Sequence, residues 1–224
     1  METLVICPSR ARPQNIAALL DCWEATEATA TLAVCLDEDD PCYPEYAALL
    51  EPWPLHLVMT ISGAWRSLCD WVNFVAVATR GAWAWDIIGQ IGDDHWPRTD
   101  GWDRAVAEAM QPLGVVYCND LHQGEALPTA AFVDAEIVRR LGYMVPPTIQ
   151  HLYMDNYFKT LGEWLGTLTY LPDVVIEHMH PHSGKSEMDD GYRQVNSPEA
   201  YRSGKAAFSA YVKRRLNDDL VKLS

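Results

Sequence analysis

The stretch IIGQIGDDHWPRTDGWD, residues 87–103, decides how the chain is expected to fold. An apolar run typical of a buried strand ends abruptly in Gly92, Asp93, Asp94 and His95. Neighbouring carboxylates repel each other, and burial increases that repulsion. In open α/β sheets, ligands bind in a crevice outside the carboxyl ends of the strands. The stretch therefore predicts a cleft at the end of this strand, with a bound cation that offsets the repulsion between the two acids.

On either side of this stretch, short β-branched and apolar runs alternate with amphipathic segments. That alternation predicts an α/β fold with a mostly parallel central sheet and helices on both faces. The predicted strands are Leu4–Cys7, Leu32–Leu36, Leu55–Met59, Trp85–Ile91, Val115–Cys118, Leu168–Leu171 and Val174–His178. The predicted helices are Gln14–Thr26, Tyr43–Leu50, Trp65–Thr79, Trp102–Met110, Val133–Leu141, Asn156–Leu165 and a tail from Pro198 to Leu216.

The composition restricts the class of protein. A formal net charge of −14 disfavours non-specific adhesion to DNA or RNA, although a local basic groove stays open as an alternative. The six cysteines form no CxxC pair, and several lie in apolar runs, which is typical of reduced thiols in a cytoplasm. We expect no signal peptide and no membrane span, because no segment approaches ~20 continuous apolar residues.

Three polar clusters each follow a predicted strand, namely PSRARP at 8–13, DEDDP at 37–41 and GDDH at 92–95. Because the carboxyl ends of parallel strands share one edge, we expect the clusters to gather there. Carboxylate oxygens suit Mg²⁺ or Mn²⁺, and the imidazole of His95 shifts the preference toward Mn²⁺. The alternative is that these acids only solvate a loop or cap the next helix.

A histidine cluster lies in VVIEHMHPHSGK, residues 174–185. His178, His180 and His182 are spaced by two, so they would share one face of an extended chain. A metal ligand is the simplest explanation, and we expect it to be His180. Two alternatives stay open: solvent-exposed histidines, and a three-histidine zinc hydrolase site. The zinc site is disfavoured because Pro181 is expected to bend the chain after His180.

The segment Ser183–Ser197 is polar and contains Gly184 and Gly191, so it is predicted to form a mobile flap. Lys185 on this flap is suited to neutralising a diphosphate.

Other polar residues suggest binding and catalysis. Arg10 and Arg12 can contact a phosphate, a ribose or a base edge, or they can be surface charge before a helix. One acid in the segment from Asp37 to Pro41 can accept a hydrogen bond from a ribose hydroxyl or a base N–H. Asp155 precedes a predicted helix, where it can be an N-cap, a general base for a hydroxyl, or both.

Taken in order, PSRARP with NIAALL, LDEDDP, IGDDHWPRTDGWD, MDNYFKTLG and LPDVVIEHMHPHSGK resemble a known family. They resemble the small, family-2-like glycosyltransferases of the GT-A fold that occur in tailed phages and their actinobacterial hosts. The resemblance runs from about Leu4 to about Asn196. It implies a Rossmann-like GT-A domain over residues 1–196 and a C-terminal helix over 197–224 that packs on it.

The resemblance also implies roles for particular residues. GDDH stands at the place of the DxD metal motif, with His95 in place of the last Asp. The implied metal ligands are Asp94, His95 and His180, with His178 and His182 as further candidates. Asp155 matches the catalytic base of inverting members. The implied donor-binding residues are Pro8, Ser9, Arg10, Arg12, Asp37, Asp39, Asp93 and Lys185.

The implied activity is metal-dependent transfer of a sugar from a nucleoside-diphosphate sugar, expected to be a UDP-sugar, to a hydroxyl with inversion; a retaining outcome stays open. The cofactor would be Mn²⁺ or Mg²⁺. The acceptor would be a phage structural protein, a modified base in phage DNA or a glycan, in the host cytoplasm, and a homodimer is a further expectation. The alternatives are a nucleotidyltransferase, a sugar-nucleotide hydrolase, and a non-catalytic carbohydrate-binding or virion protein.

Overall fold

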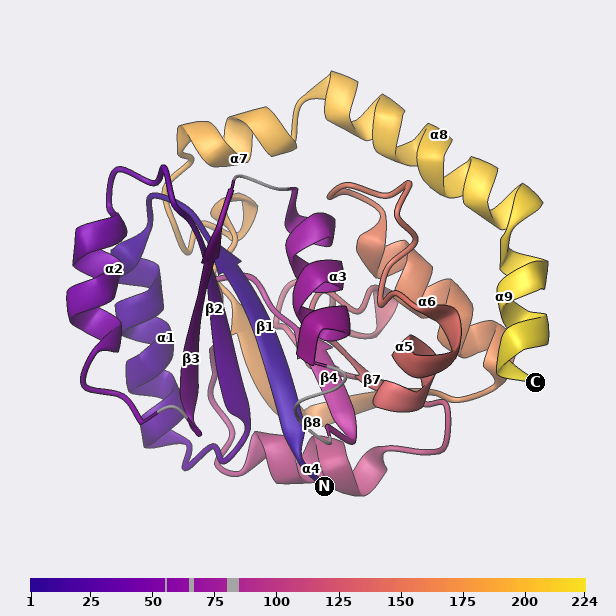
Figure 1. The fold of residues 1–224 in the computed structure, drawn as a ribbon, viewed down its shortest axis with the longest axis horizontal. Coiled ribbons are helices and arrows are strands. Elements are labelled where there is room, and N and C mark those ends of the chain that lie inside the picture. Colours follow the sequence, from indigo (N-terminus) through magenta and orange to yellow (C-terminus); the bar gives the residue numbers. More distant parts are fainter. Residues whose placement is uncertain (55, 65–66, 80–84) are drawn as a thin grey trace.

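The computed structural model describes residues 1–54, 56–64, 67–79 and 85–224, and its ribbon is shown in Figure 1. Within these residues the strands form an eight-stranded sheet with the order β3-β2-β1-β4-β7-β6-β8-β5. The strands are β1 (Thr3–Ser9), β2 (Thr31–Asp37), β3 (Val58–Gly63), β4 (Ile87–Gln90), β5 (His95–Pro97), β6 (Val115–Asn119), β7 (Ala131–Asp134) and β8 (Leu168–His178).

The sheet is mostly parallel, as predicted. Strands β3, β2, β1 and β4 run parallel to one another. Strand β7 is antiparallel to both β4 and β6, and β8 returns parallel to β6. The short strand β5 is antiparallel to β8 at the edge of the sheet. The expected α/β class is therefore confirmed, with β7 and β5 as antiparallel exceptions.

Helices cover both faces of this sheet (Figure 1). They are α1 (Pro13–Ala25), α2 (Tyr43–Leu50), α3 (Leu68–Ala78), α4 (Trp102–Ala109), α5 (Ala135–Leu141), α6 (Met154–Leu165), α7 (Asp190–Val195), α8 (Pro198–Arg214) and α9 (Leu216–Leu223). No helix within the described ranges is long and apolar enough to cross a membrane.

The core has two layers, one on each face of the sheet. Along β1, Leu4 and Ile6 pack in the layer that contains α3, α5 and α6. Their neighbours Val5 and Cys7 pack in the layer that contains α1, α2 and α4. Successive side chains of a strand point to opposite faces, so a strand covered on both sides is apolar at every position. This explains the continuous apolar run LVIC at the start of the chain.

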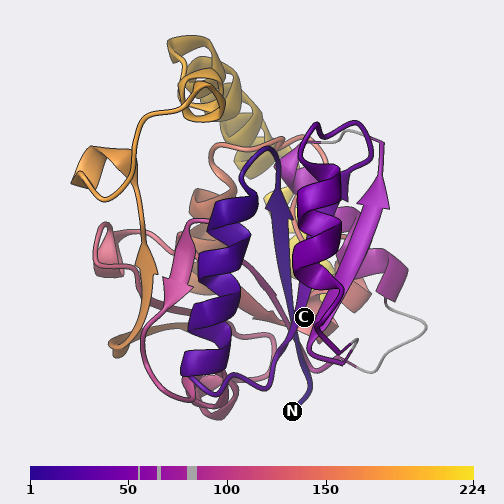
Figure 2. The ribbon, with the colours of Figure 1, turned by 90° about the vertical axis from the view of Figure 1, so that its left-hand side faces the viewer.

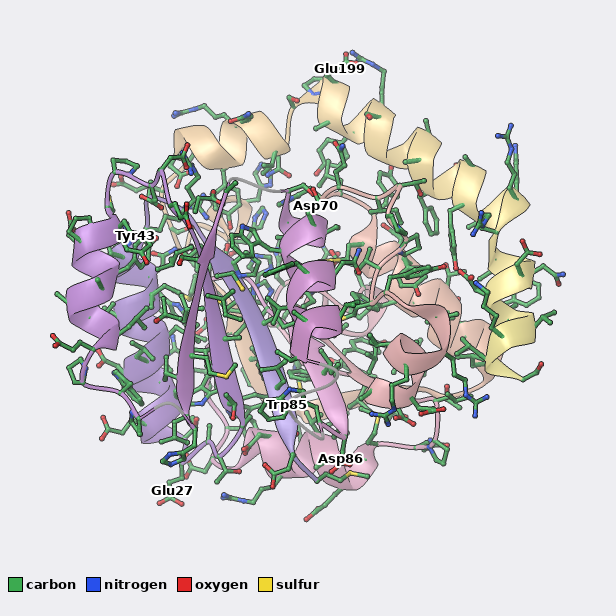
Figure 3. The ribbon with its side chains drawn as sticks, in the orientation of Figure 1. Glu27, Tyr43, Asp70, Trp85, Asp86 and Glu199 are labelled. Atoms are coloured by element: carbon green, nitrogen blue, oxygen red, sulfur yellow. The ribbon has the colours of Figure 1, made fainter. Side chains whose placement is uncertain are left out.

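Local sequence sets where several helices begin. Helix α3 begins after Ser67, whose hydroxyl accepts from the backbone N–H of Asp70 at 3.2 Å, while the Asp70 side chain accepts from the Ser67 N–H. Figure 3 shows Asp70 at this end of α3. The predicted start of this helix at residues 65–66 and of the third strand at residue 55 lie outside the described residues. The described part of that strand is Val58–Gly63 rather than 55–59.

Three further elements differ from the predicted ones. Residues 131–134 form β7 instead of the start of a helix, because the Asp134 side chain accepts from the Glu136 N–H and caps α5 there. The two extended segments near residue 171 form one strand, β8. Its pairing with β6 shifts register where Pro172 has no N–H to donate. The predicted tail helix breaks at Arg215 into α8 and α9.

The carboxyl ends of β1, β2 and β4 meet at one edge of the sheet, at the top of Figure 1. Helices α7 and α8 run along this same edge. Helix α9 packs against α5 and α8, which brings the C-terminal segment back onto the domain. The division of the chain at residues 196 and 197 stays a prediction.

Candidate functional site

The site is assembled by the pairing of β5 with β8. In this antiparallel pair, His95 lies directly opposite His178, and their rings stack with centroids 3.9 Å apart. The backbone N–H of Met179 donates to the carbonyl of Asp94 at 2.8 Å, which extends the pairing past the strand end. The two polar clusters predicted from sequence are therefore brought together by a short non-local strand pair.

Asp94 contacts a nitrogen of each of the two stacked imidazoles. Its Oδ1 is 3.0 Å from Nδ1 of His95, and its Oδ2 is 3.5 Å from Nε2 of His178. One ligand atom from each of the three residues lies within 4.8 Å of the others. Asp94 and His95 are buried and His178 is nearly so. Burial alone would raise the pKa of Asp94, but hydrogen bonds from His178 and His95 outweigh it and hold that pKa well below its usual range.

This group fits a divalent cation. Nε2 of His95 and Nδ1 of His178 are buried and have no hydrogen-bond partner within the described part of the chain. Buried polar atoms in native proteins normally have a partner. Here each ring has one nitrogen that lacks one among the described residues, while its other nitrogen faces Asp94. One carboxylate with two imidazoles suits a first-row transition metal such as Mn²⁺ better than Mg²⁺.

The structure places His178, rather than His180, in this three-residue group. His180 lies next to it, with ring centroids 4.9 Å from His178 and 4.9 Å from His182. A short helical turn at Pro181–Ser183 bends the chain directly after His180, as expected for this proline. The role of His180 as a metal ligand stays a prediction.

His122 also joins the histidine cluster, although sequence patterns do not single it out. Its ring stacks on His180 with centroids 4.8 Å apart. It follows β6, so the rule on strand carboxyl ends could have identified it.

Asp120 supports both His122 and His178. Its buried Oδ1 accepts from the backbone N–H groups of residues 122, 123 and 124 at 2.7–2.9 Å. Its Oδ2 accepts from the Thr129 hydroxyl at 2.7 Å and lies 3.8 Å from Nδ1 of His178. Burial lowers the pKa of His178, but the Asp120 and Asp94 carboxylates outweigh it and raise that pKa to about 9. No sequence motif indicates this arrangement.

Asp93 faces the loop after β1. It accepts from the Ser9 hydroxyl at 2.6 Å and from the Asn15 amide at 3.3 Å, and Ser9 in turn bonds Tyr46 at 2.8 Å. Burial, with the charge of Asp94, raises the pKa of Asp93 above its usual range. Pro8, another predicted donor-binding residue, pairs with β2 opposite Cys35.

Arg10 and Arg12 extend from this loop in different directions. Arg10 pairs with Asp37 at 2.8 Å and with Asp39 at 2.7 Å. The other oxygen of the buried Asp37 accepts from the indole N–H of Trp71 at 3.0 Å. These contacts bring together three of the predicted nucleotide-binding residues.

Arg12 and Asp94 both contact α7, which lies inside the segment predicted to be a flap. Nε and Nη2 of Arg12 each donate to the carboxylate of Asp189 at 2.8 Å, and Nη1 lies 3.4 Å from Asp93. The Arg12 guanidinium also lies over the ring of Tyr192, 4.8 Å from its centroid. The Tyr192 hydroxyl donates to Oδ2 of Asp94. Neither Asp189 nor Tyr192 is indicated by a sequence motif.

Lys185 lies on the same segment but contacts neither Asp94 nor Arg12 directly in this structure. It pairs with Glu177 at 2.8 Å, and Glu177 also pairs with Arg98 at 2.9 Å. The preceding Gly184 has a φ of +73°, a left-handed conformation that favours glycine.

Asp155 lies in the first turn of α6. The N-cap of that helix is Tyr153, which has a left-handed φ of +73°, so Asp155 is not the capping residue. Burial raises the pKa of Asp155 to about 7; His178 lowers it and Asp120 raises it. Of these two residues, His178 belongs to the histidine cluster and Asp120 contacts it, with Oδ2 3.8 Å from Nδ1 of His178.

Comparison with known proteins finds similarity in fold. No protein-family model matches the sequence, and no curated protein matches it. A mannosyltransferase from Pyrobaculum calidifontis, in complex with GDP-Man and Mn²⁺, is similar with a TM-score of 0.64 at 14% identity. The match covers 95% of this chain and 75% of that chain.

Two further structures show the same likeness. One is TarS 1-349 from S. aureus in complex with UDP-GlcNAc, with a TM-score of 0.57 at 10% identity over 96% of this chain and 73% of that chain. The other is glucosyl-3-phosphoglycerate synthase from Mycobacterium tuberculosis in complex with Mn²⁺, UDP and phosphoglyceric acid. Its TM-score is 0.59 at 11% identity, over 92% of this chain and 78% of that chain. The chain therefore has the GT-A fold of nucleotide-sugar glycosyltransferases, which confirms the expected fold.

Proposed function

We propose that this chain is a metal-dependent glycosyltransferase, which moves a sugar from a nucleoside-diphosphate sugar to a hydroxyl group. The observation that carries the proposal is the convergence of Asp94, His95 and His178 at the carboxyl edge of a GT-A sheet. Similar solved structures hold GDP-Man with Mn²⁺, UDP-GlcNAc, and UDP with Mn²⁺. Their likeness in fold supports a donor site of the same class here.

On the donor side, Asp94, His95 and His178 would hold Mn²⁺, with His180 and His182 next to them. The bound cation would offset charge on the diphosphate as the sugar–oxygen bond breaks. Arg12 lies beside Asp93, with Nη1 3.4 Å from its carboxylate, and from there its guanidinium can bind a phosphate. Lys185 would add a second positive charge when its segment moves away from Glu177.

The nucleoside would bind beside β1 and β2. Asp93, held by Ser9 and Asn15, would accept from the ribose hydroxyls. Asp37, positioned by Arg10 and Trp71, would accept from a base N–H, and Asp39 would hold Arg10 from its other side. The backbone at Pro8 would line the bottom of the nucleoside site.

On the acceptor side, Asp155 would act as the general base. A carboxyl with a pKa of about 7 can take a proton from a hydroxyl near neutral pH, because base catalysis is most effective when the pKa lies near the working pH. The deprotonated oxygen would then attack the sugar carbon on the face opposite the leaving diphosphate. This single displacement inverts the configuration at that carbon.

The proposal extends to the setting that the sequence motifs suggest. The motifs resemble those of small transferases from tailed phages, so the acceptor would be a phage structural protein, a modified base of phage DNA or a glycan in the host cytoplasm. The donor would be a UDP-sugar, chosen because such donors are common. The catalytic unit would be residues 1–196 with the helices of 197–224 packed on it, and a homodimer is part of the proposal.

The experiment is incubation with a panel of UDP- and GDP-sugars in Mn²⁺, followed by measurement of nucleoside diphosphate and of sugar bound to acceptor. Transfer to a hydroxyl acceptor supports the proposal. Release of free sugar alone, with every acceptor class tested, would instead indicate a hydrolase. Absence of binding by all donors would contradict the proposal and indicate a non-catalytic protein. Asp155→Asn should retain donor binding and lose transfer.

A further inference from the structure

Positive charge in this acidic protein is concentrated in its C-terminal helices. Residues 190–224, which span α7 to α9, contain seven of the 17 Lys and Arg residues but four of the 31 Asp and Glu residues. These helices therefore carry a net positive charge, and the rest of the chain is more negative than the total of −14. Such a separation of charge along a sequence is typical of a surface for an anionic partner.

Packing fixes which side of α8 faces the domain. A Cβ atom at Gly204 would lie 3.0 Å from the Tyr153 ring, so the helix backbone sits directly on that side chain. Phe208 stacks on Tyr153 with centroids 5.8 Å apart, and the Tyr211 hydroxyl donates to Asp219 at 2.9 Å. Gly204, Phe208 and Tyr211 therefore form the inner side of α8.

The opposite side of α8 carries a row of cations. Arg202, Lys205 and Lys213 are all exposed, and their spacing of three and eight residues places them within one sector of the helix. We name these three residues the basic stripe. It spans about 16 Å along the helix axis. Glu199 pairs with Arg202, and Figure 3 shows Glu199 at the outer edge of α8.

We propose that the basic stripe binds double-stranded DNA, which would then present the acceptor hydroxyl on a base; this rests on the proposed transferase function. DNA carries one negative charge per about 1.7 Å of its axis, so a straight row of cations can contact several phosphates at once. The strongly acidic remainder of the protein repels the same duplex. Contact is therefore confined to α8, which fixes the orientation of the duplex on the protein.

A flat membrane fits this surface less well. Around the stripe, the outer side of α8 holds Ala206, Ser209 and Ala210. The exposed Tyr201 and Val212 lie at its margin, and no Trp, Phe or Leu side chain is exposed on this helix. The chain outside α7 to α9 carries a net negative charge, so an anionic plane that meets more of the protein is repelled more than a rod that touches α8 along a line. Figure 2 shows α7 and α8 standing out from the body of the domain.

The stripe lies close to the proposed catalytic base. The inner side of α8 packs on Tyr153, which is the N-cap of α6 and precedes Asp155 by two residues. A duplex on the outer side would therefore lie within about one helix diameter of the acceptor side of the site. A base hydroxyl would reach Asp155 only after its nucleotide swings out of the stack.

The test is fluorescence anisotropy of a short unmodified DNA duplex with the full chain, as a function of salt. Three phosphate contacts predict a slope of about −3 in log K against log salt, which is about a 40-fold loss of affinity between about 50 and about 200 mM. Lys205→Gln should lower the magnitude of that slope by about one, and removal of all three charges should abolish binding. Arg104→Gln, on α4 at the far end of the molecule in Figure 1, is the matched control and should leave the slope unchanged.

Three outcomes would overturn the inference: no binding of DNA at about 50 mM salt, equal binding by the variant that lacks the stripe, or binding to anionic phosphatidylserine vesicles without binding to DNA. The same variants are tested for a UDP- and Mn²⁺-dependent rise in melting temperature. If UDP and Mn²⁺ still raise the melting temperature but DNA does not bind, the proposed DNA-binding role of the basic stripe is rejected and the transferase proposal stays intact. DNA binding without that rise rejects the donor site alone.

Discussion

The identity of the third residue beside Asp94 and His95 is set by strand register. His178 lies opposite His95 because β8 pairs with β5 in one register. A shift by one residue would place Glu177 or Met179 there, because successive side chains of a strand point to opposite faces. The histidine that joins the carboxylate is thus decided by a pairing between residues more than eighty positions apart.

If His178 is a ligand, His178→Ala should weaken Mn²⁺ binding by about tenfold or more, because it removes one of three ligand atoms. His182→Ala, in the same cluster but outside the three-residue group, is the matched control and should change the affinity little. Titration of Mn²⁺ followed by electron paramagnetic resonance measures both. Equal losses in the two variants would reject this assignment, and a larger loss in His180→Ala would transfer the role to His180.

The raised pKa of Asp155 predicts how transfer depends on pH. The base acts only when deprotonated, and with a pKa of about 7 half of it is protonated at that pH. The value of kcat/KM should therefore fall as pH decreases through about 7, by about tenfold per unit below it. A profile that stays flat down to pH 5 would show that another group takes the proton.

The same shift has a consequence for stability. The folded protein holds the Asp155 proton up to about pH 7, while the unfolded chain releases it near its ordinary pKa of about 3.9. This residue therefore stabilises the fold fully below that ordinary value, and the contribution is lost as pH rises through about 7. In denaturant titrations, the free energy of unfolding of Asp155→Asn should rise relative to that of wild type as the pH is raised from 4 to 7, because Asn does not titrate. A constant difference across that range would contradict the shift.

At the scale of elements, helix α7 and its N-cap residue hydrogen-bond to side chains that the proposed donor and its metal would need. Asp189 takes two N–H donors of Arg12, and Tyr192 donates to the oxygen of Asp94 that also faces His178. A carboxylate beside a guanidinium competes directly with a phosphate for the same donors. Donor binding therefore requires α7 to move or to share these contacts.

Asp189→Asn should strengthen donor binding, because it removes the carboxylate that competes for Arg12. An ion pair this exposed contributes on the order of 1 kcal/mol or less, so the gain is at most about fivefold in Kd. Calorimetry with UDP and Mn²⁺ measures it, with the exposed Glu187→Gln in the same segment as control. Weaker binding in Asp189→Asn would mean that α7 forms a wall of the donor site instead.

Sequence patterns predict the elements that carry strong local signals. The strands around Leu4 and Leu32 and the acids after them are found because apolar runs end in clustered charge. Strand β5 is missed because it has three residues, of which His95 and Pro97 are atypical of strands. Its existence depends on β8, which is distant in sequence. Asp189 and Tyr192 are missed for the same reason, since their partners lie in loops that only the fold brings near.

At the scale of the whole molecule, the site depends on close packing beneath it. Gly89 in β4 lies against Phe132 of the neighbouring strand, and a Cβ atom there would come within 2.4 Å of that ring. Phe132 also packs on Trp102, with centroids 5.6 Å apart, so the ring has little freedom to move away. The glycine therefore sets the spacing between the sheet and α4, in the strand that leads to Asp93 and Asp94.

Gly89→Ala should destabilise the protein by about 1–3 kcal/mol through overpacking. For a chain of this size that corresponds to about 2–4 °C in Tm per kcal/mol. Differential scanning calorimetry measures the change, and Gly89→Ala combined with Phe132→Leu should recover part of it. An unchanged Tm in the single variant would show that the sheet can adjust.

The central claim is that one divalent cation, held by Asp94 and the imidazoles beside it, joins a sugar nucleotide to this sheet edge. Calorimetric titration of UDP and of GDP, with and without Mn²⁺, into wild type and Asp94→Ala tests it most directly. We predict that one of the two nucleotides binds wild type only when Mn²⁺ is present, and that Asp94→Ala abolishes this binding. Binding that is unchanged by Mn²⁺ or by Asp94→Ala, or no binding of either nucleotide, would contradict the claim.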